Sequence, residues 1–265
     1  MMSHTLTPDS SSATLRQAGQ PPAASPTFSP LYRQIKGLML RALGEGEWGP
    51  GAMIPSEADL AARFGVSQGT VRKAIDEMAA ENLLVRRQGK GTFVATHNDP
   101  RAFYRFLRLA SNDGSVRPTR SVPLSCRHVA ATEAVAQALR LQAGDAVVTL
   151  ERTLNFAGEN GEHVVLDEIF LPGDIFGSLT LERLQQEERS LYSVFESWFG
   201  VRMIRAEERL RAIPANAHAA ALLVVPEGAP LLLVERITYT YGDRPVEWRR
   251  GFYNTEHYHY FNELS

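Results

Sequence analysis

Apolar side chains recur at helical spacing from about residue 29 onward. Ser29 and Pro30 have the residue types of an N-cap and a first helical position, and Gly44 is typical of a helix end. The apolar residues between them share one helical stripe, which predicts a first helix. These residues are Leu31, Ile35, Leu38, Met39 and Leu43.

Two further helices are predicted after a Gly-Pro-Gly turn at residues 49–51. Ser56 and Asp59 stand three residues apart, as at the start of a helix, and Gly65 ends that short helix. Ser67 then caps a third helix. The apolar stripe of the third helix consists of Val71, Ala74, Ile75 and Met78.

A β-hairpin and a linker are predicted next. Leu83–Arg86 and Thr92–Ala95 are β-prone runs, joined by a basic and glycine-containing tip at residues 87–91. Thr96–Arg101 has turn residues and no apolar periodicity, so we place a linker there. Three helices followed by a hairpin are typical of a winged helix-turn-helix, whose recognition helix enters the major groove of DNA.

The charge of this region fits DNA binding, but the alternative that it is only a small structural bundle with a solvated face stays open at this point. At 100° per residue, Arg72 and Lys73 point away from the apolar stripe of the third helix. Six basic and three acidic residues stand between Arg63 and Val94, although the whole chain carries 28 − 30 = −2. Phosphate contacts require such local positive charge.

An internal repeat organises the C-terminal part. A shift of 84 residues superposes Arg127 on Arg211, Gly144 on Gly228 and Arg152 on Arg236. Each copy predicts a strand, a capped Ala-rich helix and two further strands, which favours an α+β domain with a mainly antiparallel sheet and a pocket between its halves. The predicted elements are Ser125–Val129, Glu133–Leu139, Ala146–Arg152, Val164–Leu171, Thr180–Gln186, Leu191–Phe199, Arg209–Ile213, Ala217–Leu223, Pro230–Arg236 and Val246–Tyr253.

Composition excludes a wholly disordered chain, a collagen and a coiled-coil rod. The 265 residues are 44% hydrophobic and 22% charged, which is ordinary for a globular protein, and Cys126 is the single cysteine. One cysteine forms no intramolecular disulfide and no structural zinc cluster. No secretory or membrane-spanning segment is recognisable, so we expect a cytoplasmic protein. Residues 1–29 have few large apolar side chains, and we expect a disordered tail.

Several motifs resemble a known family. Together they are similar to the winged helix of the GntR family of bacterial transcription regulators, and the later part resembles the UTRA effector-binding domain of its HutC subfamily. The N-terminal motifs are Pro30–Ile35, Ile54–Ala61, Phe64–Ser67, Thr70–Ile75 and Gly89–Val94, and the C-terminal ones are Leu150–Arg152, Ser190–Tyr192 and Pro245–Trp248.

The resemblance implies a set of DNA contacts. Arg72 is implied to contact a base or its adjacent phosphate, Ser67 and Thr70 to contact phosphates, and the wing to lie near the backbone. Ala58 and Gln68 stand where many relatives have arginine, and Gln68 can read adenine instead. The full expected set is Ser56, Glu57, Ser67, Gln68, Thr70, Arg72, Lys73, Gly89, Lys90, Gly91 and Thr92.

The resemblance also implies a small-molecule effector site. A helix N-terminus at Ser190 can hold an anion with its free amides, and Arg152 can add a guanidinium. Because Leu154 stands where an Arg-x-Arg pattern would place a second arginine, a carboxylate or a less charged sugar-derived metabolite is favoured over a phosphosugar. The implied ligand-binding residues are Arg152, Ser190, Tyr192, Glu247 and Tyr258.

Other interpretations of these residues stay open. Glu151–Arg152 and Glu235–Arg236 could merely pair at the sheet surface, and the C-terminal tyrosines, Tyr258 included, could pack in the core and a dimer contact. His257 and His259 could bind a metal from one face of a strand, but His-x-His is common, and we expect no metal and no cofactor.

These observations predict a metabolite-responsive repressor that binds double-stranded palindromic operator DNA as a homodimer, away from membranes. The expected divisions are a tail at 1–29, a winged helix at 30–96, a linker at 97–102 and an effector-binding and dimerisation domain at 103–265. UTRA domains resemble chorismate lyase in fold, so an enzyme with an appended helix-turn-helix is one alternative, although no catalytic motif is recognisable. A DNA binder that no longer senses a ligand is the other.

Overall fold

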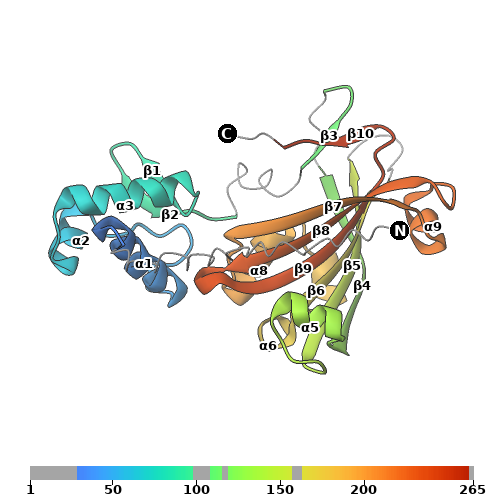
Figure 1. The fold of residues 1–265 in the computed structure, drawn as a ribbon, viewed down its shortest axis with the longest axis horizontal. Coiled ribbons are helices and arrows are strands. Elements are labelled where there is room, and N and C mark those ends of the chain that lie inside the picture. Colours follow the sequence, from blue (N-terminus) through green and yellow to red (C-terminus); the bar gives the residue numbers. More distant parts are fainter. Residues whose placement is uncertain (1–28, 98–107, 115–118, 157–162, 263–265) are drawn as a thin grey trace, which may run out of the picture.

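The structure is a computed structural model, and it describes residues 29–97, 108–114, 119–156 and 163–262. The N-terminal helices and hairpin form one lobe, and a long curved sheet forms the other (Figure 1). The predicted α+β class is confirmed, with a winged helix-turn-helix ahead of a mainly antiparallel sheet. Residues 1–28 of the expected tail and most of the expected linker lie outside the described residues.

The N-terminal lobe has the predicted order of three helices and a hairpin. The predicted start of the first helix was wrong: Pro30, and not Ser29, is its N-cap, because Pro30 keeps an extended ψ of 143°. The hairpin strands also lie one residue away from the predicted positions. The elements are α1 (Leu31–Gly44), α2 (Glu57–Phe64), α3 (Gln68–Ala80), β1 (Leu84–Arg87) and β2 (Gly91–Val94).

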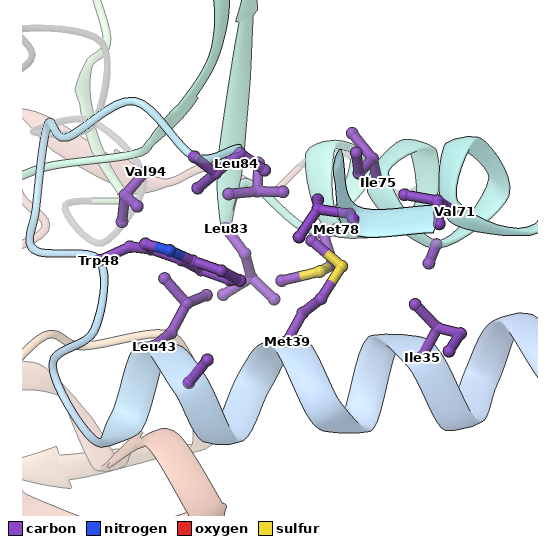
Figure 2. Close-up of a cluster of buried hydrophobic side chains, with 14 of the residues drawn as sticks. Ile35, Met39, Leu43, Trp48, Val71, Ile75, Met78, Leu83, Leu84 and Val94 are labelled. Carbon is purple, nitrogen blue, oxygen red and sulfur yellow. The ribbon is translucent and has the colours of Figure 1, made fainter. Parts of the chain in front are cut away.

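One apolar core joins these elements. Met39 on α1 and Met78 on α3 face each other, and the indole of Trp48 lies between Leu43 and Val94 (Figure 2). All four predicted stripe residues of α3 are buried, whereas Leu31 and Leu38 of the predicted α1 stripe are exposed. The core fixes α3 from one side and leaves its other side at the surface.

The C-terminal lobe is built on a six-stranded antiparallel sheet. The strand order is β4-β5-β6-β9-β8-β7, so the two repeats meet where β6 pairs with β9. The strands are β4 (Thr119–Ala130), β5 (Ala146–Phe156), β6 (His163–Pro172), β7 (Arg205–Pro214), β8 (Pro230–Thr240) and β9 (Arg244–Tyr253).

The repeat extends to details of the two equivalent helices, α5 (Glu133–Leu139) and α9 (Ala217–Leu223). Thr132 and Asn216 cap their N-termini with side-chain oxygens. Arg140 and Val224 end them in the left-handed conformation, with φ of 54° and 55°. These positions are 84 residues apart in each case, as the sequence repeat predicts.

Three helices between the repeats pack together with part of the sheet. They are α6 (Gly173–Phe176), α7 (Leu181–Gln185) and α8 (Leu191–Phe199). The rings of Phe176 and Phe195 pack against each other in the core of this layer, with 4.7 Å between the ring centres. The short pair β3 (Leu109–Ser111) and β10 (Tyr258–Tyr260) was not predicted. No helix of the described residues is long and apolar enough to cross a membrane.

The two lobes contact each other through a buried arginine. The Arg202 guanidinium donates to the carbonyl oxygens of Leu83 at 3.0 Å and Asn82 at 2.8 Å, just beyond α3. It also donates to the Tyr241 hydroxyl at 3.2 Å, and Tyr241 packs against the core of the N-terminal lobe. Arg202 therefore ties the C-terminal end of α3 to the sheet domain.

Candidate DNA-binding surface and effector cavity

The N-terminus of α3 is set by the turn that joins it to α2. Gly65 ends α2 at φ +65°, and Ser67 then caps α3 by accepting from the Thr70 amide at 3.2 Å. The Ser67 and Thr70 hydroxyls also contact each other at 2.9 Å. Gln68 is exposed beside them. The three residues expected near DNA at this helix start are thus brought together.

Arg72 projects from the exposed side of α3, where the sequence places it, and its side chain is 62% exposed. Its Nε donates to Oε2 of Glu57, at the start of α2, at 2.9 Å. The other oxygen of Glu57 accepts from Arg86 of β1 at 3.0 Å, and Arg86 also donates to Asp76 at 2.6 Å. Glu57 therefore links α2, α3 and the wing.

The remaining expected DNA contacts lie at the same lobe's surface. The Lys73 ammonium stands 4.1 Å from the centre of the Tyr32 ring. At the wing tip, Gly89 has φ +69° and Gly91 φ +114°, conformations that favour glycine. Lys90 between them is exposed, and Thr92 is half-buried on β2.

Ser56 is exposed, and it also caps the N-terminus of α2. Its side chain accepts from the Asp59 amide at 3.2 Å, and the Asp59 carboxylate accepts from the Ser56 amide at 3.2 Å. This capping box stabilises the start of α2. The same turn positions Glu57 for its contact with Arg72.

A cavity of about 870 Å³ opens on the C-terminal lobe, with a size that suits a small metabolite. It lies between β4, β5 and the start of α8. Three of the five expected ligand residues, Arg152, Ser190 and Tyr192, line it. The other lining residues include His97, Arg120, Ser121, Glu187, Glu188, Arg189, Leu191, Arg236, Arg249 and Tyr253.

Behind the cavity lies a chain of buried charges. Arg152 donates through Nε to Asp167 at 3.0 Å and through Nη1 to Ser121 at 3.3 Å. Arg249 donates to Asp167 at 3.3 Å and through Nε to Glu247 at 2.7 Å. Asp167 and Glu247 have no exposed side-chain surface. The carboxylates thus hold both guanidinium groups in place.

Tyr192 connects this chain to α8. Its hydroxyl donates to Glu247 at 2.7 Å, so Glu247 lies behind the cavity wall rather than in its lining. Burial, with a smaller contribution from Glu247, raises the pKa of Tyr192, and burial raises the pKa of Tyr253 to about 12. Both phenols are therefore neutral at physiological pH. Burial, with the nearby Arg249, lowers the pKa of Arg152.

The alternative of surface pairing within Glu151–Arg152 and Glu235–Arg236 was wrong. Successive side chains of a strand point to opposite faces. Arg152 and Arg236 are buried, and Arg236 pairs with Glu208 at 2.6 Å through Nε. The two glutamates instead pair on the other face: Glu151 with His218 at 2.8 Å, and Glu235 with Arg211 at 2.6 Å.

The structure does not bring Tyr258 to the cavity. Its ring stacks on Phe156 at 4.7 Å within an apolar cluster, because β10 pairs with β3 and not with the main sheet. Tyr253, the last residue of β9, lines the cavity instead. Of the two interpretations of Tyr258, packing in the core is therefore the one that the structure shows.

Sequence reasoning missed Asp167, Arg236, Arg249 and Tyr253. Arg249 had a usable signal, because it stands two residues after Glu247 on one strand and so shares its face. Asp167 had none, since a lone aspartate in an apolar strand carries no motif. Among the residues that the structure describes, no group of three or more His, Cys, Asp or Glu side chains could hold a metal ion. His259, one of the two histidines considered for a metal, instead contacts Oδ1 of Asn112 through Nδ1 at 2.8 Å.

Comparison with known protein families gives a match for each lobe. The UTRA domain family matches residues 116–259, more than half of the chain, and the family described as "Bacterial regulatory proteins, gntR family" matches residues 31–94. The chain belongs to the GntR family. As a member with a UTRA domain, it is a DNA-binding transcription regulator of the HutC-like type.

This GntR-family regulator is similar to characterised repressors over nearly its whole length. The HTH-type transcriptional repressor NagR of Bacillus subtilis is 27% identical over 243 residues, which cover 89% of this chain and 96% of that protein. The histidine utilization repressor of Pseudomonas putida is 28% identical over 242 residues, covering 89% and 90%. Neither match leaves a large part of the relative unaccounted for.

Solved structures agree on the fold. The ligand-binding domain of a GntR-family transcriptional regulator from Bordetella bronchiseptica is 50% identical, with a TM-score of 0.59, and the match covers 61% of this chain and 99% of that one. The regulator YydK of Bacillus subtilis is 19% identical with a TM-score of 0.53, over 89% of this chain and all of the other, which shows the likeness of fold alone.

Proposed function

We propose that the protein is a metabolite-responsive transcriptional repressor that binds a palindromic operator as a homodimer. One observation carries the proposal: the same chain has an exposed α3, with Arg72 pointing outward, and a separate cavity that is lined by buried arginines. A twofold dimer presents two such helices to two half-sites, about one helical turn or less apart.

Support for the DNA contacts comes from the shape of the N-terminal lobe. Ser67, Gln68 and Thr70 stand at the N-terminus of α3, where free amides favour phosphate, and Arg72 lies one turn further along. Lys90 at the wing tip adds a cation for the DNA backbone. Within this interpretation, Arg72 contacts base edges and the others set the register.

The effector that suits the cavity is a small carboxylate. The backbone amides of Leu191 and Tyr192 at the start of α8 can donate hydrogen bonds to an anionic group, and Arg152 and Arg120 lie in the same cavity wall. The buried carboxylates Asp167 and Glu247 occupy much of the donor capacity of Arg152 and Arg249, which disfavours a doubly charged phosphate.

Names of the relatives point to the same chemistry. Besides the histidine utilization repressor, they include the mannosyl-D-glycerate transport/metabolism system repressor MngR and a probable fructoselysine utilization operon repressor, both of Escherichia coli. Histidine, mannosyl-D-glycerate and fructoselysine each carry a carboxylate. We infer a carboxylate-bearing metabolite for this chain as well, without assigning one of these three.

Coupling between the cavity and DNA is proposed to pass through the segment after the wing. His97 lines the cavity, and its backbone amide donates to Glu196 of α8 at 3.0 Å. Its carbonyl accepts from Ser193 at 2.9 Å, and Thr96 donates to the same glutamate. Because the first residues of α8, Leu191 and Tyr192, line the cavity, a shift of α8 on ligand binding would move the start of the linker.

The test combines operator selection with a metabolite screen. Duplexes selected from a random library by the purified protein should be palindromic and bind two protomers. A thermal-shift panel of L-histidine, mannosyl-D-glycerate, fructoselysine and glucose 6-phosphate then probes the cavity, followed by wider carboxylate libraries. A carboxylate is expected to raise the melting temperature and release the duplex.

Two arginine variants separate sensing from DNA binding. Arg152→Ala, or Arg152→Lys if the alanine variant unfolds, should keep operator binding and lose the response to the carboxylate. Arg250→Ala serves as the control, because Arg250 pairs with Glu168 in a half-exposed position and does not line the cavity. A full response in Arg152→Ala would contradict the assignment of the cavity, and turnover of a panel compound would favour an enzyme.

A further inference from the structure

Glu57 is the single acidic residue in the expected set of DNA contacts. DNA is strongly negative, and a carboxylate on the DNA-binding surface repels phosphate. Glu57 is the first residue of α2, and its side chain remains 19% exposed beside Arg72 and Arg86. Because this repulsion weakens DNA binding, we ask what other contribution to DNA recognition the Glu57 carboxylate makes.

The contacts of Glu57 show what that gain is. Arg72 approaches Oε2 with both Nε at 2.9 Å and Nη2 at 2.8 Å, which fixes the plane of its guanidinium. Arg86 approaches Oε1 at 3.0 Å from the wing and is held from its other side by Asp76 at 2.6 Å. One carboxylate thus orients a cation of the recognition helix and a cation of the wing.

The local backbone also keeps Glu57 in place. It lies in the first turn of α2, where the helix dipole favours an acidic side chain, and the capping box of Ser56 and Asp59 fixes that turn. The hydrogen bond from Arg72 lowers the pKa of Glu57, with a smaller lowering contribution from Arg86, so the group stays ionised through neutral pH.

We propose that Glu57 is a positioning residue that sets sequence selectivity by orienting Arg72 and Arg86 before DNA arrives. A base edge is recognised by a guanidinium in one orientation, whereas phosphate is attracted by a cation in any orientation. Glu57 therefore lowers affinity for DNA in general and raises the preference for the operator. This inference rests on the proposed function, because it requires that Arg72 contacts DNA bases.

The test measures two affinities for the full-length protein. Binding is measured to a palindromic duplex selected from a random library and to a scrambled duplex of equal length, at several salt concentrations. A base contact is worth roughly five- to 150-fold in affinity. Glu57→Gln is expected to bind the scrambled duplex at least as tightly as wild type, while the ratio of the two affinities falls several-fold.

Glu47→Gln is the matched control. It also removes one negative charge from the surface of the N-terminal lobe, but Glu47 accepts from Arg63 at 2.9 Å and does not contact Arg72. Glu47→Gln should leave the selectivity ratio unchanged. In an Arg72→Ala background, Glu57→Gln should change the ratio by less than it does in wild type, because only the contact with Arg86 then remains for Glu57 to orient.

Three results would overturn the inference. The first is a wild-type ratio in Glu57→Gln, and the second is an equal loss of selectivity in Glu47→Gln. The third is a full additional effect of Glu57→Gln in the Arg72→Ala background. If wild-type protein itself preferred no duplex over scrambled sequence, the proposed function would fail instead, so the two failures are distinguishable.

Discussion

Replacing Asp167 by asparagine should strongly destabilise the C-terminal lobe. Asp167 has no exposed side-chain surface and accepts from Arg152 at 3.0 Å and from Arg249 at 3.3 Å. Asparagine is nearly the same size, so packing is kept and only the charge is lost. The positive charges of both guanidinium groups then stay buried without the negative charge that balanced them. Leaving a buried charge without its partner strongly lowers the free energy of unfolding.

The expected magnitude follows from the burial of the pair. Removal of one partner of a buried ion pair costs about 3–5 kcal/mol of unfolding free energy. For a domain of 150–250 residues each kcal/mol lowers the melting temperature by about 2–4 °C, so the variant should melt roughly 6–20 °C below wild type. Urea unfolding followed by circular dichroism gives the free energy directly.

Glu168→Gln on the same strand is the control. Glu168 pairs with Arg250 at 2.9 Å, but their side chains are 30% and 35% exposed, and such pairs are worth at most about 1 kcal/mol. The two variants therefore make the same change of charge at adjacent positions that face opposite ways. A loss below 1 kcal/mol in Asp167→Asn, or equal losses in both variants, would refute this account of the buried charge chain.

Three further predictions concern the wing, pH and backbone conformation. Lys90→Ala should weaken binding to selected and scrambled duplexes equally and reduce the salt slope by about one for each phosphate that the lysine no longer neutralises; loss of selectivity alone would contradict a phosphate role. The hydrogen bond from Arg189 lowers the pKa of Glu187 from 4.5 to about 2. Glu187→Gln should therefore be less stable than wild type above pH 4.5, and the difference should vanish as the pH falls to 2. A difference in stability that does not depend on pH would contradict this. Gly65→Ala should destabilise the winged helix by about 1 kcal/mol because φ is +65°, whereas Gly37→Ala inside α1 should stabilise it by about 0.5–1 kcal/mol; equal signs in thermal melts would contradict the backbone argument.

Local elements were predictable where short-range chemistry determines them. The helices α5, α8 and α9 were predicted to the residue, because Thr132, Ser190 and Asn216 are N-caps that their sequence context makes evident. The repeat also predicted the two equivalent halves of the sheet. The start of α1 was missed by one residue, since Ser29 and Pro30 compete for the cap position and local sequence does not decide between them.

Contacts between distant segments were not predictable. His97 follows the wing in sequence yet lines the cavity, because α8 holds it through Ser193 and Glu196. Tyr253 was predicted to end a strand and Tyr258 to contact the ligand, and the pairing of β10 with β3 places Tyr258 away from the cavity. The motif resemblance identified Arg152 and Tyr192 but gave no sign of Asp167, whose importance arises from complete burial between two arginines.

The placement of α3 in the major groove with Arg72 at the bases is the central claim. Its most direct test is the affinity of full-length wild type and Arg72→Ala for the selected palindrome and for a scrambled duplex, across a salt titration. Wild type should prefer the palindrome, and Arg72→Ala should lose roughly five- to 150-fold of that preference per half-site while still binding scrambled DNA in a salt-dependent way. An Arg72→Ala protein that selects the palindrome as strongly as wild type would contradict the account.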